Sequence, residues 1–189
     1  MTTKSSNNPS DILSRITSDS RYTELLDWGE PRPGHPEGTV RAHIAELEGN
    51  LARLSDRLTE DEQSKLRLLI HTHDTFKGSA QPGVAITHPQ SHASLARAFL
   101  EEFCDDDDLL AMVQYHDEPY ALWRQFRQKG TYSAGRMDGL IASIHDWDLF
   151  LAFNLVDGCT KGKDRKPIRW FLQELGNRVS SKWSEQDIL

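Results

Sequence analysis

The chain has 189 residues, 37% of them hydrophobic and 27% charged, which fits one globular domain with a core of its own. The net charge of −7 argues against broad nucleic-acid binding, and no apolar stretch approaches the roughly 18 residues that span a bilayer, so no membrane partner is expected. The two cysteines, Cys104 and Cys159, form no CxxC pair, which argues against a disulfide framework and favours a cytoplasmic protein.

The first third of the chain alternates between polar and helical patterns. The first residues are small and polar, so we expect a disordered tail over 1–9, followed by one helical domain over 10–189. A first helix is predicted over 11–26. The segment 29–38 is dense in glycine and proline, which is typical of a loop. Thr39 is typical of the N-cap of the helix that follows it.

Capping and breaking signals place the remaining helices. Thr59 and Glu62 form a capping-box pattern before a helix that reaches residue 74. The segment 77–89 indicates a loop whose last proline suits the first turn of the next helix. Strand patterns are almost absent, so the predicted fold class is all-α, a single helical domain. The later helices are expected over 89–103, 108–116, 118–129, 137–156 and 166–182.

Three histidines fall on the apolar stripes of three different predicted helices: His43, His73 and His116. Asp74 follows His73 and is expected to lean inward, and Asp157 closes the long helix. An unpaired buried carboxylate is costly, so such groups are rarely buried without a partner. One divalent ion can satisfy imidazoles and carboxylates that converge from separate helices. Each residue alone is more often a hydrogen-bonded core or surface group, but their joint placement favours a metal site.

The order of these residues resembles that of the HD superfamily of metal-dependent phosphohydrolases. The segment GHPEGTVRAHI (34–44) is similar to the one that carries the first ligand there. The segment HDTFKG (73–78) resembles the HDxGKG turn, with Phe76 where glycine is usual. The segment LVDGCTKGKD (155–164) is similar to the closing helix with its final aspartate. The resemblance implies that one metal ion is held by His43, His73, Asp74 and Asp157.

Two further segments resemble the branches of this family that hold two metal ions. The segment HPQSHASLARAFL (88–100) is similar to HPxxGAxLL, and VQYHDEP, which contains His116, matches the segment with the next extra histidine. The resemblance implies a second ion held by His88 and His116 and bridged by Asp74. His92, which stands at the glycine of HPxxGAxLL, is the rival of His88 as a ligand. The implied cofactor is one or two divalent ions of manganese, magnesium, iron or nickel.

This resemblance implies a phosphohydrolase that acts on a nucleotide or another small phosphorylated substrate. Two ions bridged by Asp74 would activate water and hold a phosphoryl oxygen. Lys77 would neutralise charge in the transition state, so Asp74 and Lys77 are the expected catalytic residues. Four residues of the basic run 161–169 would form a phosphate-binding edge together with Lys77: Lys161, Lys163, Arg165 and Lys166. A solvated loop lysine and a solvated tether between helices are the alternative interpretations of these basic groups.

The same ligand types serve other chemistries, and two alternatives stay open. HD-fold oxygenases similar to myo-inositol oxygenase use a di-iron site with comparable ligands to cleave a C–C or C–P bond. A non-catalytic, nucleotide-sensing HD module is the other alternative. The sequence does not identify the substrate, because aromatic side chains at helical spacing are more often part of a core than of a pocket wall. It gives no signal for the oligomeric state. The aromatic residues concerned are Tyr115, Tyr120, Trp123, Trp147 and Trp170.

Overall fold

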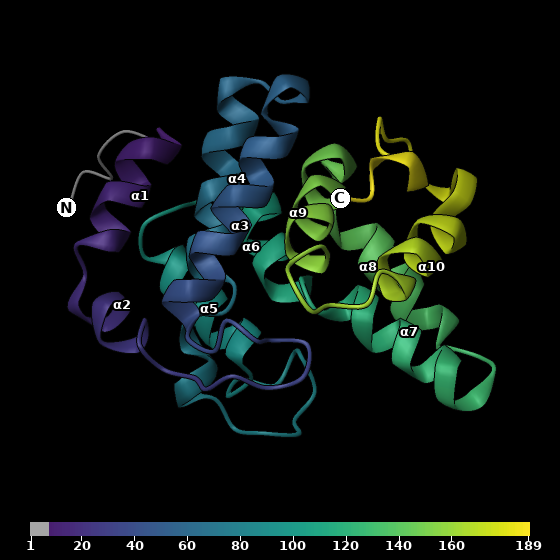
Figure 1. The fold of residues 1–189 in the computed structure, drawn as a ribbon, viewed down its shortest axis with the longest axis horizontal. Coiled ribbons are helices and arrows are strands. Elements are labelled where there is room, and N and C mark those ends of the chain that lie inside the picture. The colour runs from purple at the N-terminus through teal and green to yellow at the C-terminus, as the bar shows by residue number, and fades with distance from the viewer. Residues whose placement is uncertain (1–7) are drawn as a thin grey trace.

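The computed structural model describes residues 8–189, and every regular element in this range is a helix (Figure 1). The predicted all-α fold class is confirmed. Of the tail predicted over 1–9, residues 1–7 lie outside the described part, while Asn8 caps the first helix and Pro9 begins it. A proline suits that first turn because its missing N–H would have no partner inside the helix anyway.

The helices are mostly short and are joined by loops and single turns. In chain order, the α-helices are α1 (Pro9–Thr17), α2 (Ser20–Leu25), α3 (Val40–Leu54), α4 (Glu60–Thr72), α5 (His92–Glu101), α6 (Asp107–Tyr115), α7 (Glu118–Lys129), α8 (Ala134–Ser143), α9 (Trp147–Gly158) and α10 (Lys166–Leu175). The 3-10 turns are η1 (Ser55–Arg57), η2 (Thr75–Ser79), η3 (Gly176–Arg178) and η4 (Glu185–Asp187).

Side-chain caps fix the starts of α3 and α4, as their sequences predict. The Thr39 hydroxyl accepts a hydrogen bond from Ala42 N at 3.2 Å. Thr59 and Glu62 form a complete capping box, in which each side chain accepts from the other residue's backbone N–H, at 2.7 and 3.2 Å. These bonds satisfy backbone donors that have no partner inside a helix.

The long helix predicted over 137–156 is wrong, because the chain folds there into α8 and α9. Asp146 caps α9 by accepting from Leu149 N at 2.9 Å. The Asp108 carboxylate accepts from the backbone N–H groups of His145 and Asp146, at 2.8 Å each. Hydrogen bonds from backbone N–H groups to these aspartates replace helical ones, which is why the apolar pattern does not continue as one helix.

Three other predicted helices also have different boundaries in the structure. The helix expected over 11–26 is interrupted, because Asp19 caps α2 by accepting from Arg21 N. The helix expected over 89–103 begins only at His92, because Ser91 is its N-cap and accepts from Ser94 N at 3.0 Å. The last helix ends at Leu175 rather than 182, and Gly176 with a φ of +47° follows it.

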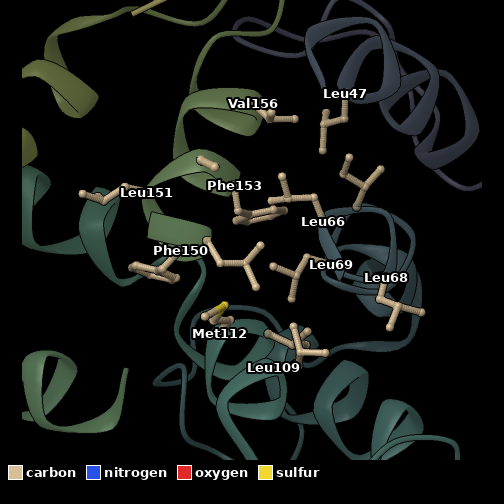
Figure 2. Packing of buried hydrophobic residues seen from close by; sticks show 14 of the residues in the cluster. Leu47, Leu66, Leu68, Leu69, Leu109, Met112, Phe150, Leu151, Phe153 and Val156 are labelled. Carbon is tan, nitrogen blue, oxygen red and sulfur yellow. The ribbon is translucent and has the colours of Figure 1, made fainter. Parts of the chain in front are cut away.

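Helix α9 lies at the centre of the core. Its residues Phe150 and Phe153 are fully buried, and side chains from α3, α4 and α6 surround them, among them Leu47, Leu69 and Met112 (Figure 2). Burial on all sides explains why α9 is apolar around most of its circumference. This central position fixes the residue at the end of α9 relative to the surrounding helices.

The helices are arranged along one long axis, with α1 and α2 at one end, α7 and α10 at the other, and α3, α4 and α9 between them (Figure 1). Within residues 8–189, no single helix is both long and apolar enough to cross a membrane. Helices α8 and α9 reach that length and composition only as a pair, and the pair is bent by 116° at its break.

Candidate metal centre

Six ligand-type side chains lie at helix ends that meet in one place. They come from the C-terminal ends of α4, α6 and α9 and from the first turns of α3 and α5. The backbone at a helix C-terminus carries partial negative charge, so three such ends favour a cation nearby. The six residues are His43 (α3), His73 and Asp74 (end of α4), His92 (α5), His116 (end of α6) and Asp157 (α9).

The first group consists of His43, His73 and Asp157. His43 Nε2 lies 3.0 Å from Asp157 Oδ1, and His73 Nε2 lies 4.0 Å from the same oxygen. Both imidazoles are buried, whereas the Asp157 side chain is 19% exposed. Asn50 fixes the end of α9 against α3, because its Nδ2 donates a hydrogen bond of 2.8 Å to the Val156 carbonyl.

The second group consists of Asp74, His92 and His116. The Nε2 atoms of His92 and His116 lie 3.1 Å apart, at 3.8 and 3.5 Å from Asp74 Oδ1. Asp117 Oδ2 lies 3.2 Å from His92 Nε2, and this carboxylate is 42% exposed. The second group is therefore the more open of the two.

Asp74 joins the two groups, because each of its oxygens faces one of them. Its Oδ2 lies 3.3 Å from His73 Nε2 and 3.7 Å from His43 Nε2, whereas its Oδ1 faces His92 and His116. Neighbouring ligand atoms bound to one ion at about 2.1 Å lie about 3.0 Å apart, and more widely in an open site. The separations between the groups' atoms fit two adjacent ions that share Asp74.

The tautomers of two buried imidazoles follow from their backbone contacts. His73 Nδ1 lies 3.0 Å from the Leu69 carbonyl oxygen and 3.1 Å from that of Ile70. His116 Nδ1 lies 2.8 Å from the Val113 carbonyl oxygen. A carbonyl only accepts, so each Nδ1 carries a proton and donates. In the neutral ring, Nε2 then presents a lone pair to the site, as in most metal-binding histidines.

This arrangement leaves acceptors facing acceptors. Within residues 8–189, His73 Nε2 and Asp74 Oδ1 are both buried without a hydrogen-bond partner. Such an atom costs about 1–3 kcal/mol, and facing lone pairs repel each other. A cation between the lone pairs removes both penalties, and imidazole with carboxylate is a donor set typical of divalent transition metals. The buried His/Asp groups could therefore hold a metal ion.

Two lysines also reach into the groups. Lys77 Nζ lies 2.5 Å from Asp74 Oδ2, and Lys163 Nζ lies 2.7 Å from Asp157 Oδ1. Burial by itself would raise the pKa of the Asp74 carboxyl, but the charge of Lys77 and contacts with the imidazoles of His73 and His116 outweigh burial and hold that pKa well below its usual range. Lys163 does the same for the pKa of Asp157. Both carboxyls are therefore ionised, which is the form that binds metal.

The two buried imidazoles at the ends of α4 and α6 differ in their protonation. Burial lowers the pKa of His73, so that ring is neutral near pH 7 and suited to be a ligand. Burial also disfavours the charged form of His116, but Asp117 and Asp74 outweigh burial and raise its pKa. The carboxylates of Asp74 and Asp117 thus favour positive charge at the position of His116.

The relation of this chain to known proteins was tested in three ways. No family model, no curated protein and no solved structure matches it. The chemistry of the centre is therefore inferred from the side chains that form it.

Residues of both groups line a cavity of about 410 Å³, a size that suits a small organic ligand. Asp74, His116 and Asp157 form part of its lining, together with Lys77 and Lys163. The cavity gives both groups access to a ligand.

The structure brings together most of the predicted site residues: His43, His73, Asp74, Lys77, His116 and Asp157. The expectation for His88 is corrected. Its side chain is exposed, and its Nδ1 accepts a hydrogen bond from Gln90 N at 3.2 Å. Because α5 begins at His92, the first turn of the helix presents His92 to the centre and leaves His88 in the preceding loop.

The expectation for the basic run is corrected as well. The Arg165 guanidinium donates hydrogen bonds to the backbone carbonyls of Cys159, Thr160 and Lys163, at 2.7–2.9 Å, so it stabilises the end of α9. Lys161 is exposed and does not line the cavity. Spacing along the chain could not tell which member of the run points inward, and the structure shows that Lys163 does.

Phe76, at the position where the resembling motif has glycine, is accommodated without strain. It lies in η2, and no non-glycine residue of 8–189 has a positive φ. Its ring packs on Phe99, with 5.1 Å between the ring centroids. Gly78 is the residue that needs to be small, because a Cβ there would lie 2.6 Å from the Trp28 ring.

Sequence reasoning missed His35 and Glu37, which form a third group with His43. Their signal was a histidine and a glutamate inside the glycine- and proline-rich loop directly before His43. Of the aromatic residues considered, Tyr120 and Trp123 line the cavity.

Proposed function

We propose that the chain is a metal-dependent phosphohydrolase similar to members of the HD superfamily, with two divalent ions that share one carboxylate. The observation that carries this proposal is the orientation of Asp74, whose two oxygens face different pairs of imidazoles. A ligand that bridges two ions requires this orientation. The expected ligands are His43, His73, Asp74 and Asp157 for the first ion, and Asp74, His92 and His116 for the second.

When bound, two such ions supply Lewis acidity that activates a water molecule and neutralises charge on a phosphoryl group. The side chains of the protein would orient the substrate. Lys77 and Lys163 pair with Asp74 and Asp157, and cations at those carboxylates would release both ammonium groups towards the cavity. There they would donate hydrogen bonds to phosphoryl oxygens, where negative charge builds up in the transition state.

The charge of the cavity supports an anionic substrate once metal is present. Its lining contains four carboxylates and two ammonium groups, so two negative charges are in excess. Two divalent cations would invert this excess to two positive charges. A phosphate dianion complements that charge, whereas the metal-free cavity would repel it.

Apolar residues in the lining of the cavity support an organic group on the phosphoester. Tyr120, Trp123 and Ile168 are among the lining residues, and the two aromatic rings lie 5.5 Å apart with 31° between their planes. Tyr120 is 49% exposed although it is large and largely apolar. A nucleotide or another small phosphoester with a planar or apolar group would cover these rings.

Phosphate release tests the proposal. Metal-free protein would be reloaded with Mn²⁺, Mg²⁺, Fe²⁺ or Ni²⁺ and assayed against a panel of phosphomonoesters and nucleotides. We expect activity with at least one ion and two ions bound per chain. Lys77→Met should keep the metal but lower turnover by about 10²–10³-fold, with the exposed Lys161→Met as the matched control. Absence of phosphate release with every ion would refute the hydrolase.

A di-iron oxygenase is the second candidate function, and one observation favours it. Asp74, His92 and His116 form a set of two histidines and one carboxylate, which is the donor set of many mononuclear non-haem iron oxygenases and would hold one iron of the pair. The set belongs to the more open group, which leaves room for a further ligand. Loading with Fe²⁺ and addition of oxygen with a candidate substrate distinguish the candidates, since an oxygenase would consume oxygen with its substrate and a phosphohydrolase would not.

A further inference from the structure

A carboxylate outside the two groups contacts one of the proposed ligands from the side away from the site. Glu37 belongs to the loop between α2 and α3, and its Oε1 lies 2.9 Å from Nδ1 of His43 and 2.9 Å from Nδ1 of His35. The Glu37 side chain is only 4% exposed, and its Oε2 is buried without a hydrogen-bond partner within residues 8–189. Burial of a carboxylate is costly, so this position calls for a function.

We infer that Glu37 is a positioning residue that sets the tautomer of His43 and, through the same carboxylate oxygen, that of His35 in the wall of the cavity. This inference rests on the proposed function, because it places Glu37 behind a ligand of the metal ions. Neither residue belongs to the ligand set proposed for the ions.

The tautomer of His43 follows from the two carboxylates on either side of its ring. A neutral imidazole has one N–H, so it can donate either to Glu37 through Nδ1 or to Asp157 through Nε2. With a metal ion beside Asp157, Nε2 must present its lone pair, and the proton must lie on Nδ1. Glu37 accepts that proton's hydrogen bond. The Nδ1–Oε1 distance already suits it, and a small rotation of the ring would align it.

The loop that carries Glu37 is held in place by its own backbone. The residues Arg32 and His35 exchange two backbone hydrogen bonds, at 2.8 and 3.0 Å, which close a tight turn. Pro36 packs so closely on Gly162 that a Cβ at Gly162 would lie 2.8 Å from it. The loop is thus fixed against the segment that carries Lys163, and a fixed support can orient a ligand.

His35 lies at the cavity end of this chain of contacts. It lines the cavity, its side chain is 23% exposed, and its Nδ1 is used by Glu37. In the neutral ring, its other nitrogen, Nε2, then carries a lone pair and can only accept a hydrogen bond, from water or from a substrate hydroxyl group. Lys77 and Lys163 line the same cavity and are the donors available to a phosphoryl group.

Metal affinity tests the role of Glu37 without reference to turnover. Metal-free wild-type protein, Glu37→Gln and the matched control Glu30→Gln, an exposed residue of the same loop, would be titrated with Mn²⁺ and followed by electron paramagnetic resonance. We expect Glu37→Gln to weaken binding about 10–100-fold, as loss of a carboxylate behind a ligating histidine does, and Glu30→Gln to bind like wild type. Unchanged affinity in Glu37→Gln would overturn the inference while leaving the two-metal proposal intact. No Mn²⁺ binding by wild-type protein would instead overturn the proposed function.

Two further readouts separate positioning from a merely structural role. Long-range ¹H–¹⁵N spectra of the metal-free protein should show more of the His43 proton on Nδ1 in wild type than in Glu37→Gln. Equal proton distributions in the two proteins would overturn the inference. His35→Gln should keep most of the Mn²⁺ affinity, because it leaves the Glu37 carboxylate in place behind His43. A fall as large as that in Glu37→Gln would show that the effect is not specific to Glu37.

Discussion

At the scale of single residues, the centre is defined by which ring nitrogen each histidine turns inward. Backbone carbonyls of the preceding turn take the Nδ1–H of His73 and His116, so Nε2 is left for the site in both. The C-cap position of a histidine therefore determines which of its ring nitrogens faces the site, because carbonyls in the last turn of a helix can accept hydrogen bonds from side chains. Asp74 then meets these lone pairs with both of its oxygens.

Replacement of Asp74 should have the largest effect on metal content. Asp74→Asn keeps the volume of the side chain but removes the charge that two ions would share, so we expect both ions to be lost. Elemental analysis of protein loaded with Mn²⁺ measures this, with circular dichroism as a check of folding. Asp61→Asn, an exposed position on the same helix, is the control. Retention of two ions in Asp74→Asn would show that this carboxylate does not bridge them.

The two histidines near the start of α5 should behave differently. His92→Ala should lower the metal content from two ions to one, because His92 lies beside His116 and Asp74. His88→Ala should keep both ions, since its side chain is exposed in the loop before α5. Elemental analysis of both variants decides the matter, and loss of an ion only in His88→Ala would reverse the assignment.

At the scale of elements, the centre depends on where helices stop. Three C-terminal ends and two N-terminal first turns supply its side chains, and each boundary is fixed by a cap or by a side chain bound to backbone. At the end of α9, Arg165 binds the carbonyls that the helix leaves unpaired, and the chain turns so that Lys163 points back to Asp157. A substitution of a residue that fixes one of these helix ends should therefore change the geometry of the centre without touching its ligands.

Arg165 provides a test of this support. Arg165→Lys should lower the free energy of unfolding by about 1.5–3 kcal/mol, because a single ammonium group cannot replace a guanidinium that donates to several carbonyls at once. Urea denaturation of the metal-free protein measures the effect. Lys161→Met, in the same exposed run, should leave stability unchanged. An unchanged stability of Arg165→Lys, together with weaker substrate binding, would restore Arg165 as a substrate contact.

At the scale of the whole molecule, the centre joins parts of the chain that are far apart in sequence. His43 and Asp157 are separated by 114 positions and lie 3.0 Å apart at their nearest side-chain atoms. An ion that binds both holds α3, α4 and α9 together, and these helices also form the middle of the core. Metal binding should therefore stabilise the folded state against global unfolding.

Metal removal should lower the melting temperature. With free Mn²⁺ at a hundredfold of its dissociation constant, one bound ion adds about 2.7 kcal/mol to the free energy of unfolding. For a chain of this size, that corresponds to a shift of about 5–10 °C. Calorimetry with and without a chelator measures the shift, and the Asp74→Asn variant, which should show none, is the control. Equal melting temperatures with and without chelator in the wild type would contradict a site inside the fold.

The sequence by itself determined the features that depend on capping residues and on apolar periodicity. The caps at Thr39 and Thr59, the all-α class and the inward placement of His43, His73 and His116 follow from short-range hydrogen bonding and from apolar periodicity, which a sequence displays directly. Asp74 could be placed for the same reason, since it follows His73 at the end of a periodic helix.

Only the tertiary structure decided the questions that depend on distant partners. Asp108 interrupts the apolar run before Asp157, because its carboxylate accepts hydrogen bonds from two backbone N–H groups of that run. Asp108 lies more than 35 positions earlier in the chain, so the sequence of the run does not predict this contact. The placement of His92 rather than His88 beside the centre depended on a helix that starts at His92, with Ser91 as its N-cap. Glu37 became visible only when its loop lay beside His43. Periodicity records which face of a helix is buried, but the partner that meets that face is set by packing across the chain.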